Sequence, residues 1–265
     1  MPGLIILIVF VLLFITLFIF RKQRRKNKQA LPPDFRELLN EHVAYFRSLN
    51  DADKIRFAER IKDFFSYVNI HGVNTELNWL DKLLIASSGV IPVFGFEKWR
   101  YYNLSNILLY GDAFARENFS TGIAVGDTAG MVGSGALQQM MILSKPSLYA
   151  GFSNVYGKYN TGIHEFAHLL DKADGDTNGI PEQLLGKQNI DQWIGVVNKE
   201  IENIKNGGSD IDAYGATSRT EFFAVASEYF FQRPDLFKEN HPELFELMTM
   251  IFHQSPVFYF AEHSS

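Results

Sequence analysis

The sequence predicts an α+β protein in which helices at both ends of the folded part enclose a small sheet. Three observations support this prediction. Apolar residues recur every three or four positions in the early and the late parts of the chain, which is the period of a helix. Short apolar runs of strand length lie between these parts. The sequence H-E-x-x-H lies inside the first helical stretch after the predicted sheet.

The composition is that of an ordinary globular protein and excludes several classes. The chain has 265 residues, of which 46% are hydrophobic and 21% charged, so it is neither disordered nor fibrous. Because it has no cysteine, it forms no disulfide, and a metal would need His, Asp, Glu or water as ligands. Residues 31–265 contain 19 Lys and Arg against 30 Asp and Glu, a net charge of −11. This acidic body predicts that nucleic acid is not a partner.

The chain begins with an apolar segment. Residues 3–20 carry no charge and would form a helix about 27 Å long, close to the thickness of the hydrocarbon layer of a membrane. Six basic residues follow directly. A cleaved signal peptide is the alternative, but in such a peptide the basic residues come before the apolar stretch. We therefore predict a transmembrane anchor at 3–20 that contacts the lipid bilayer, and a basic juxtamembrane linker at 21–33.

This anchor predicts the location of the protein. Positively charged flanks stay on the cytoplasmic side of a membrane. We therefore expect a single-pass protein of the bacterial inner (cytoplasmic) membrane, with the domain 34–265 facing the cytoplasm.

The folded part begins with helical periodicity and then changes to strand patterns. Helices are predicted at 33–49 and 51–68, with a further candidate at 74–86. The short runs at 90–96, 106–110 and 137–143 predict strands, and 112–135, rich in Gly, Asp and Thr, predicts a loop. Helical patterns return afterwards, at about 158–173, 190–206, 218–231 and 240–252.

The H-E-x-x-H sequence predicts a metal site. His164 and His168 are four residues apart, so on a helix their side chains lie about 5–6 Å apart on one face. Two imidazole nitrogens at this spacing can bind one Zn²⁺. Glu165 is adjacent to the first histidine and can act on water at the metal without itself being a ligand. The alternative is a helix whose two histidines are solvated or hydrogen-bonded in the core.

A catalytic zinc site needs a third protein ligand, and the residues leave several candidates open. Asp174 follows His168 by six residues, and Asp210 or Asp212 lies further along the chain. Glu221 opens a helical stretch downstream. However, Ser218 and Glu221 also match the S-x-x-E pattern of a helix capping box, which requires no metal.

The residues around these positions resemble the MtfA (Mlc titration factor A) family of zinc metallopeptidases, whose catalytic domain is related to anthrax lethal factor peptidase. The resemblance lies in the string 163–181, in Tyr214 and in the run 221–224, and a similar segment spans about 91–114. It covers most of 35–255 and implies a zincin-like, gluzincin-type domain at 34–265. The apolar segment 3–20 is a departure from the soluble family member.

The resemblance also implies roles and partners. His164, His168 and Glu221 match the zinc ligands of the family, Glu165 its general base, and Tyr214 the tyrosine that stabilises the oxyanion. A peptide or protein is the implied substrate, and a transcriptional regulator is a candidate partner.

The expected activity is that of a membrane-tethered, zinc-dependent peptidase in which metal-activated water attacks the peptide bond with Glu165 as general base. Asp171 or Glu228 could hold a ligating histidine from behind, or could face solvent. The main alternative is a membrane-tethered protein that binds and titrates a regulator, with a zinc-stabilised fold and little or no catalysis. A purely structural zinc domain is disfavoured by the presence of Glu165.

Overall fold

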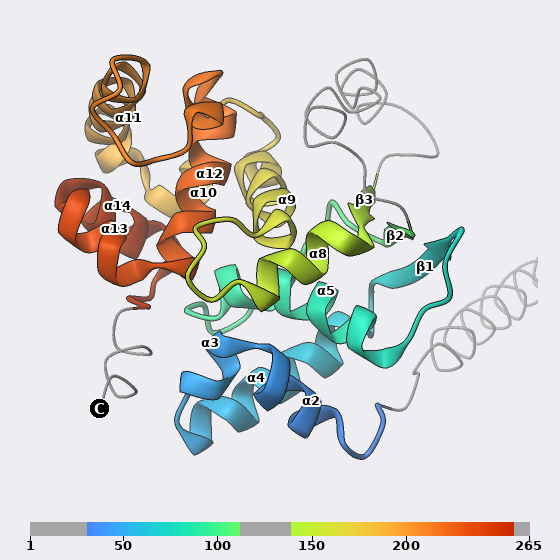
Figure 1. Ribbon diagram of the computed structural model, residues 1–265. Helices are drawn as coiled ribbons and strands as arrows, with labels where there is room; N and C mark the ends of the chain where they lie inside the picture. Colours follow the sequence, from blue (N-terminus) through green and yellow to red (C-terminus); the bar gives the residue numbers. More distant parts are fainter. Residues whose placement is uncertain (1–30, 112–138, 257–265) are drawn as a thin grey trace, which may run out of the picture.

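The computed structural model describes residues 31–111 and 139–256 of the chain. Three N-terminal helices lie at the bottom of Figure 1: α2 (Phe35–His42), α3 (Ala44–Ser48) and α4 (Asp51–Phe64). A small sheet lies to the right, and the C-terminal helices lie to the left. Helix α9 (Thr161–Asp171) lies between them.

The sheet has three parallel strands in the order β1 (Asn69–Val73), β2 (Asn106–Tyr110) and β3 (Met140–Ser144). Parallel neighbours need a crossover connection, because a tight turn reverses the chain direction. Helix α5 (Trp79–Val93) lies in the connection from β1 to β2. After β3 the chain leads into α8 (Lys145–Ser153) and then α9, so the helix with the H-E-x-x-H sequence is the second helix after the sheet.

The second half is helical. Its elements are α8 (Lys145–Ser153), α9, η1 (Lys172–Asp174), α10 (Glu182–Leu185), η2 (Lys187–Asn189), α11 (Ile190–Lys205), η3 (Ala213–Ala216), α12 (Arg219–Gln232), α13 (Pro234–Asn240) and α14 (Pro242–Phe252). Every residue of α12 from 222 to 231 is buried, so this helix runs through the core. Helix α9 packs against α12 on one side and α5 on another.

Two glycines let α9 approach α5 closely. A Cβ atom at Gly162 would lie only 2.1 Å from the Ser88 hydroxyl oxygen, and one at Gly89 would lie 2.8 Å from the Phe166 ring. Larger side chains would push the helices apart, since real Cβ atoms do not approach so closely. The depth of α9 in the core therefore depends on these two positions.

Side-chain caps fix where the main helices begin. Asn50 caps α4, and Asn78 and Asp81 form a reciprocal capping box at α5. Asn160 caps α9 and Ser218 caps α12, each accepting a hydrogen bond from the backbone N–H three residues later. These bonds satisfy N–H groups that have no partner inside the helix.

Most of the predicted elements are present, with two corrections. The helix predicted at 33–49 is broken at Val43, whose backbone is extended. The strand predicted at 90–96 is wrong, because α5 continues to Val93 and its second half is buried on all sides, which removes the helical period from the sequence. Strand β1 was not predicted. The loop predicted at 112–135 lies outside the described residues.

The predicted single-pass membrane location is also corrected. Among residues 31–111 and 139–256, no helix is both long enough and apolar enough to cross a bilayer. The segment 3–20, from whose composition the anchor was inferred, lies outside the described residues.

Candidate metal centre

Helix α9 brings the two histidines of the H-E-x-x-H sequence together. The backbone N–H of Ile163 donates to the Asn160 side chain at 3.1 Å, which fixes the first turn just before His164. The rings of His164 and His168 have centroids 4.7 Å apart, and their Nε2 atoms are 3.1 Å apart. The i, i+4 spacing on one helix face therefore produces the convergence that the sequence predicts.

Glu221 joins the two histidines from the first turn of α12. Its carboxylate oxygen Oε2 lies 3.2 Å from Nε2 of His164 and 3.5 Å from Nε2 of His168. Within the described part of the chain, these three residues offer ligand atoms within 4.8 Å of one another. The structure thus brings together the three residues that were predicted as ligands, in an arrangement that can hold one metal ion.

The capping pattern at the start of α12 is compatible with this position of Glu221. The Ser218 hydroxyl accepts a hydrogen bond from the backbone N–H of Glu221 at 3.1 Å. The Glu221 side chain points to the histidines instead of returning to the N-cap backbone. The backbone of this residue therefore completes the cap while its carboxylate faces His164 and His168.

Glu228 holds His164 from the side opposite to Glu221. Its Oε1 lies 2.7 Å from Nδ1 of His164, and its Oε2 accepts the backbone N–H of Asn160 at 2.5 Å. The side chain is buried, with 2% of its surface exposed. A carboxylate bound to Nδ1 directs Nε2 of the same ring toward the centre and makes it a better ligand. One buried carboxylate thus links the start of α9 to the orientation of His164.

The charges of the centre are strongly coupled. Burial disfavours a charged His164, but the carboxylates of Glu228 and Glu221 outweigh burial and raise its pKa to about 10. Burial also opposes ionisation of Glu221, yet the two imidazoles hold the pKa of its carboxyl well below the usual range. The carboxylates around the two imidazoles therefore favour positive charge between these side chains. A site for a cation requires such an environment.

Glu165 lies beside this cluster, half-buried on α9. Burial raises the pKa of its carboxyl, whereas the neighbouring histidines act in the opposite direction. A carboxyl with a raised pKa is suited to accept a proton and to return it.

Asp171 does not hold His168 in the way that was considered from the sequence. One of its oxygens accepts the backbone N–H of Gly179 at 2.9 Å. The other oxygen, and Nδ1 of His168, are both buried without a hydrogen-bond partner among the described residues. Burial raises the pKa of Asp171 to about 6, against the opposing effects of the Gly179 N–H and His168.

Tyr214 reaches the centre from the short helix η3. Asp212 begins this helix by accepting the backbone N–H of Tyr214 at 2.8 Å. The Tyr214 ring is half-buried, and its centroid lies 6.2 Å from that of His164. The structure therefore places this predicted residue beside the three converging side chains.

The other carboxylates that were considered as third ligands have different roles. Asp174 accepts backbone N–H groups of Asp176 and Glu182 in a turn. Asp212 caps η3 and accepts the hydroxyl of Tyr159. Asp210 binds side chains of four residues, namely Lys158, Tyr229, Asn240 and His241. The structure brings none of these three carboxylates into the group of His164, His168 and Glu221.

Glu228 and Asn160 contribute to the site but were not assigned from the sequence. Glu228 was weighed equally as a partner of the histidines and as a solvent-facing residue. The signal in its favour is its position two turns after Glu221 on the same helix face, within the stretch 222–231, where Ser227 is the one other residue that is not hydrophobic. Asn160 was not considered, although an Asn directly before a helical stretch is a common N-cap.

Comparisons with known proteins agree with this geometry. A family model described as glucose-regulated metallo-peptidase M90 matches residues 18–253. An uncharacterized protein from Synechocystis sp. is 26% identical over 247 residues, which are 89% of each chain. Two proteins named Mlc titration factor A, from Escherichia fergusonii and Cronobacter sakazakii, are 38% and 37% identical over 107 residues. Those two matches span 37% of this chain and 40% of each relative. The resemblance predicted from the sequence is confirmed by these matches.

Proposed function

Because the chain belongs to the glucose-regulated metallo-peptidase M90 family, we propose that it is a zinc-dependent peptidase that hydrolyses peptide bonds. The observation that carries this proposal is the convergence of His164 Nε2, His168 Nε2 and Glu221 Oε2, with separations of 3.1, 3.2 and 3.5 Å. The proposed peptidase unit is the domain 34–265.

The three separations support zinc as the metal. A tetrahedral Zn²⁺ with ligands at about 2.0–2.1 Å holds its ligand atoms about 3.3–3.4 Å apart. The observed separations lie around this value. In addition, Glu221 Oε2 is buried and accepts no hydrogen bond from the described residues, so a cation would satisfy it. Two imidazoles and one carboxylate are also a donor set that zinc enzymes use.

We assign Glu165 as the general base. When bound, zinc supplies a Lewis acid that lowers the pKa of water and polarises the substrate carbonyl. Glu165 lies next to the ligand His164 in the sequence, half-buried, with the pKa of its carboxyl raised by burial. In this proposal its carboxylate takes a proton from the attacking water and passes it to the leaving amine.

Tyr214 and Glu228 have supporting roles in this proposal. The Tyr214 ring lies beside His164, and this position supports a role for its hydroxyl as a hydrogen-bond donor to the oxyanion that forms when the carbonyl carbon becomes tetrahedral. Glu228 keeps the ring of His164 in the orientation that directs Nε2 inward.

The test compares zinc content and peptide hydrolysis in wild-type protein and in Glu165→Gln. We expect the variant to keep its zinc, because Glu165 is not a proposed ligand, while kcat/KM falls roughly 10²- to 10⁴-fold through loss of the base. Glu239→Gln, at an exposed position on α13, is the matched control and should behave as wild type. Undiminished hydrolysis by Glu165→Gln would assign the activity to another group.

A second candidate function is binding of a regulator without catalysis. It is supported by the name of two relatives, Mlc titration factor A, although their matches span only 40% of their length. Wild-type protein that binds zinc but cleaves no peptide from a broad pool would favour this candidate over the peptidase.

A further inference from the structure

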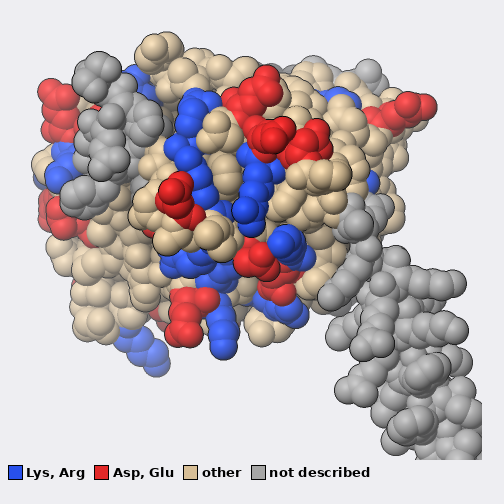
Figure 2. Space-filling model, turned by 90° about the horizontal axis from the view of Figure 1, so that it is seen from below, with Lys and Arg blue, Asp and Glu red and all other residues tan. Residues whose placement is uncertain are grey.

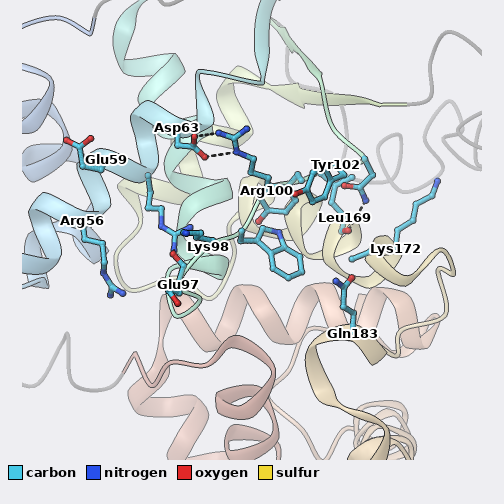
Figure 3. A pocket seen from close by; sticks show the side chains of 15 residues that line it. Arg56, Glu59, Asp63, Glu97, Lys98, Arg100, Tyr102, Leu169, Lys172 and Gln183 are labelled. Atoms are coloured by element: carbon cyan, nitrogen blue, oxygen red, sulfur yellow. Dashed lines mark hydrogen bonds and ion pairs between the residues drawn. The ribbon is translucent and has the colours of Figure 1, made fainter.

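A groove of about 970 Å³ lies at the C-terminal end of α9, the helix that carries His164 and His168, and takes no part in the functions assigned above. Its walls come from α4, from the loop 97–103, from the end of α9 with η1, and from α10. In Figure 3, Arg56 and Glu59 lie on one side of it, and Lys172 and Gln183 lie on the other. We propose that this groove binds an acidic segment of the peptide or protein substrate, an inference that rests on the proposed peptidase function.

The charge of the groove differs from that of the chain. Residues 31–265 carry a net charge of −11, yet the groove is lined by five cationic and three anionic side chains. Four of these eight side chains are in ion pairs: Arg100 binds the carboxylate of Asp63 (Figure 3), Arg56 pairs with Asp53, and Glu59 pairs with Lys62. The side-chain ammonium groups of Lys98 and Lys172 form no ion pair or hydrogen bond with the described residues, so their charges are available to a ligand. From below, Lys and Arg side chains also lie across the middle of the surface with acidic ones among them (Figure 2).

The position of the groove connects it to the reaction. Leu169 and Lys172, which line it, follow Glu165 and His168 by four residues on α9 and η1. Residues four apart on a helix lie about 5–6 Å from each other on the same face. An extended chain advances about 3.3 Å per residue. A substrate bound at the metal centre therefore reaches Lys172 about two to four residues from the bond that is cut.

The aromatic lining favours a peptide segment over a small inorganic anion. Trp99 lines the groove, and its indole N–H is buried without a hydrogen-bond partner among the described residues. Tyr102 also lines it and is 87% exposed. A ligand with carbon-rich side chains can pack against both rings, whereas a phosphate ion can use only the charges. The volume is at the upper end of the range for ligand pockets, which suits a segment of several residues.

The first experiment measures hydrolysis by the full-length, zinc-loaded protein. Matched peptide pools carry either Glu and Asp, or Gln and Asn, at two to four residues on each side of the scissile bond. Partly exposed ion pairs contribute modestly, so we expect the two lysines together to give the acidic pool a 5- to 30-fold lower KM with similar kcat. The variant Lys98→Gln with Lys172→Gln should lose this preference.

The control for charge alone is Lys187→Gln with Lys199→Gln, which removes the same net charge from exposed positions outside the groove. It should keep the preference for acidic peptides. An equal preference in wild-type protein and the groove variant, or no preference in wild-type protein, would overturn the proposal.

A binding measurement separates this inference from the peptidase proposal. The anisotropy of a fluorescein-labelled acidic peptide is followed with the Glu165→Gln protein, with and without the two groove substitutions, and with inorganic phosphate as competitor. Weaker binding only in the groove variant supports the acidic-segment site even if wild-type protein cleaves nothing, in which case the peptidase proposal alone fails. If the wild-type protein cleaves peptides but the two groove substitutions do not weaken peptide binding, the peptidase proposal stands and the proposed site for an acidic segment is wrong. Full displacement by phosphate at equimolar concentration would show an anion site that does not recognise peptides.

Discussion

The buried carboxylate of Glu228 links two parts of the candidate metal centre, although it is not one of the three converging side chains. It contacts Nδ1 of His164 and the backbone N–H of Asn160 at the start of α9. It therefore couples the orientation of the His164 ring to the start of the helix that carries it. An imidazole held in this way needs little reordering when a metal binds.

Replacing this carboxylate tests the coupling. We expect Glu228→Gln to lower zinc affinity about 10- to 100-fold, because the carboxamide offers only one acceptor oxygen for two donors and no charge to support the ring. Competition with a chelator of known affinity measures the change. Glu246→Gln, at an exposed position of α14, should leave zinc affinity unaltered. Wild-type affinity in Glu228→Gln would mean that Glu228 serves the fold alone.

Some residues could be assigned from the sequence and others could not. His164 and His168 were predictable because both lie on one helix and their distance follows from helix geometry. From residue spacing alone Glu221 was ambiguous, because Ser218 and Glu221 match a capping box as well as a metal ligand. The family resemblance assigned it as a ligand. Only the packing of α12 on α9 decides where that side chain points, and residue spacing along one segment carries no such information.

At the scale of elements, the close contact of α9 with α5 sets the depth of the metal centre. Gly162 faces Ser88 across this contact, with no room for a Cβ atom. Gly195 on α11 provides a contrast, because a Cβ atom there would meet nothing within 4 Å.

The two glycines should therefore respond oppositely to alanine. We expect Gly162→Ala to lower the free energy of unfolding by about 1–3 kcal/mol through overpacking. Gly195→Ala should raise it by up to about 1 kcal/mol, because alanine is the better helix former. Urea unfolding of both variants measures the two changes. A stabilised Gly162→Ala protein would show that the contact can relax at no cost.

A second group of elements is joined by His241, at the junction of α13 and α14. Its Nε2 lies 2.6 Å from Asp210, and its Nδ1 lies 3.2 Å from Glu200 on α11. Burial disfavours its charged form, but these two carboxylates outweigh burial and raise its pKa. The same histidine and three other donors hold the pKa of Asp210 below its usual range, against the opposing effect of burial.

A raised pKa makes the stabilisation by His241 dependent on pH. Because the folded state binds the proton more tightly, this contribution is complete below the unfolded pKa of about 6.5 and is lost as the pH rises through the folded value. We therefore expect the stability difference between wild-type protein and His241→Asn to be largest below pH 6.5 and to shrink at higher pH. Urea midpoints at pH 6 to 9 measure it. A difference that grows with pH would contradict the assignment.

The elements show where sequence patterns are informative. Amphipathic or well-capped helices such as α4, α9 and α11 were predicted to within a few residues. Helix α5 was partly misread, because its second half is buried all round and has no polar face. Strand β1 was missed because it contains His71 and Gly72, both exposed, and lacks the alternation of a half-buried strand.

At the scale of the whole molecule, the fold brings together two helices, α9 and α12, that are far apart in the sequence. The centre needs α9 and the first turn of α12 in contact, and the core around α12 provides this contact. The groove at the C-terminal end of α9 is assembled from four separate segments, so no local sequence pattern could have predicted it. A metal bound by residues that meet only in the folded chain also stabilises that fold.

In the proposed peptidase, His164, His168 and Glu221 together hold one zinc ion. Crystals of the full-length protein grown with zinc, with diffraction data collected above and below the zinc absorption edge, locate the ion directly. We predict one anomalous peak about 2.0–2.1 Å from Nε2 of both histidines and from a carboxylate oxygen of Glu221. The peak should weaken strongly in Glu221→Ala. An active, zinc-containing protein with no peak at this position would contradict the account.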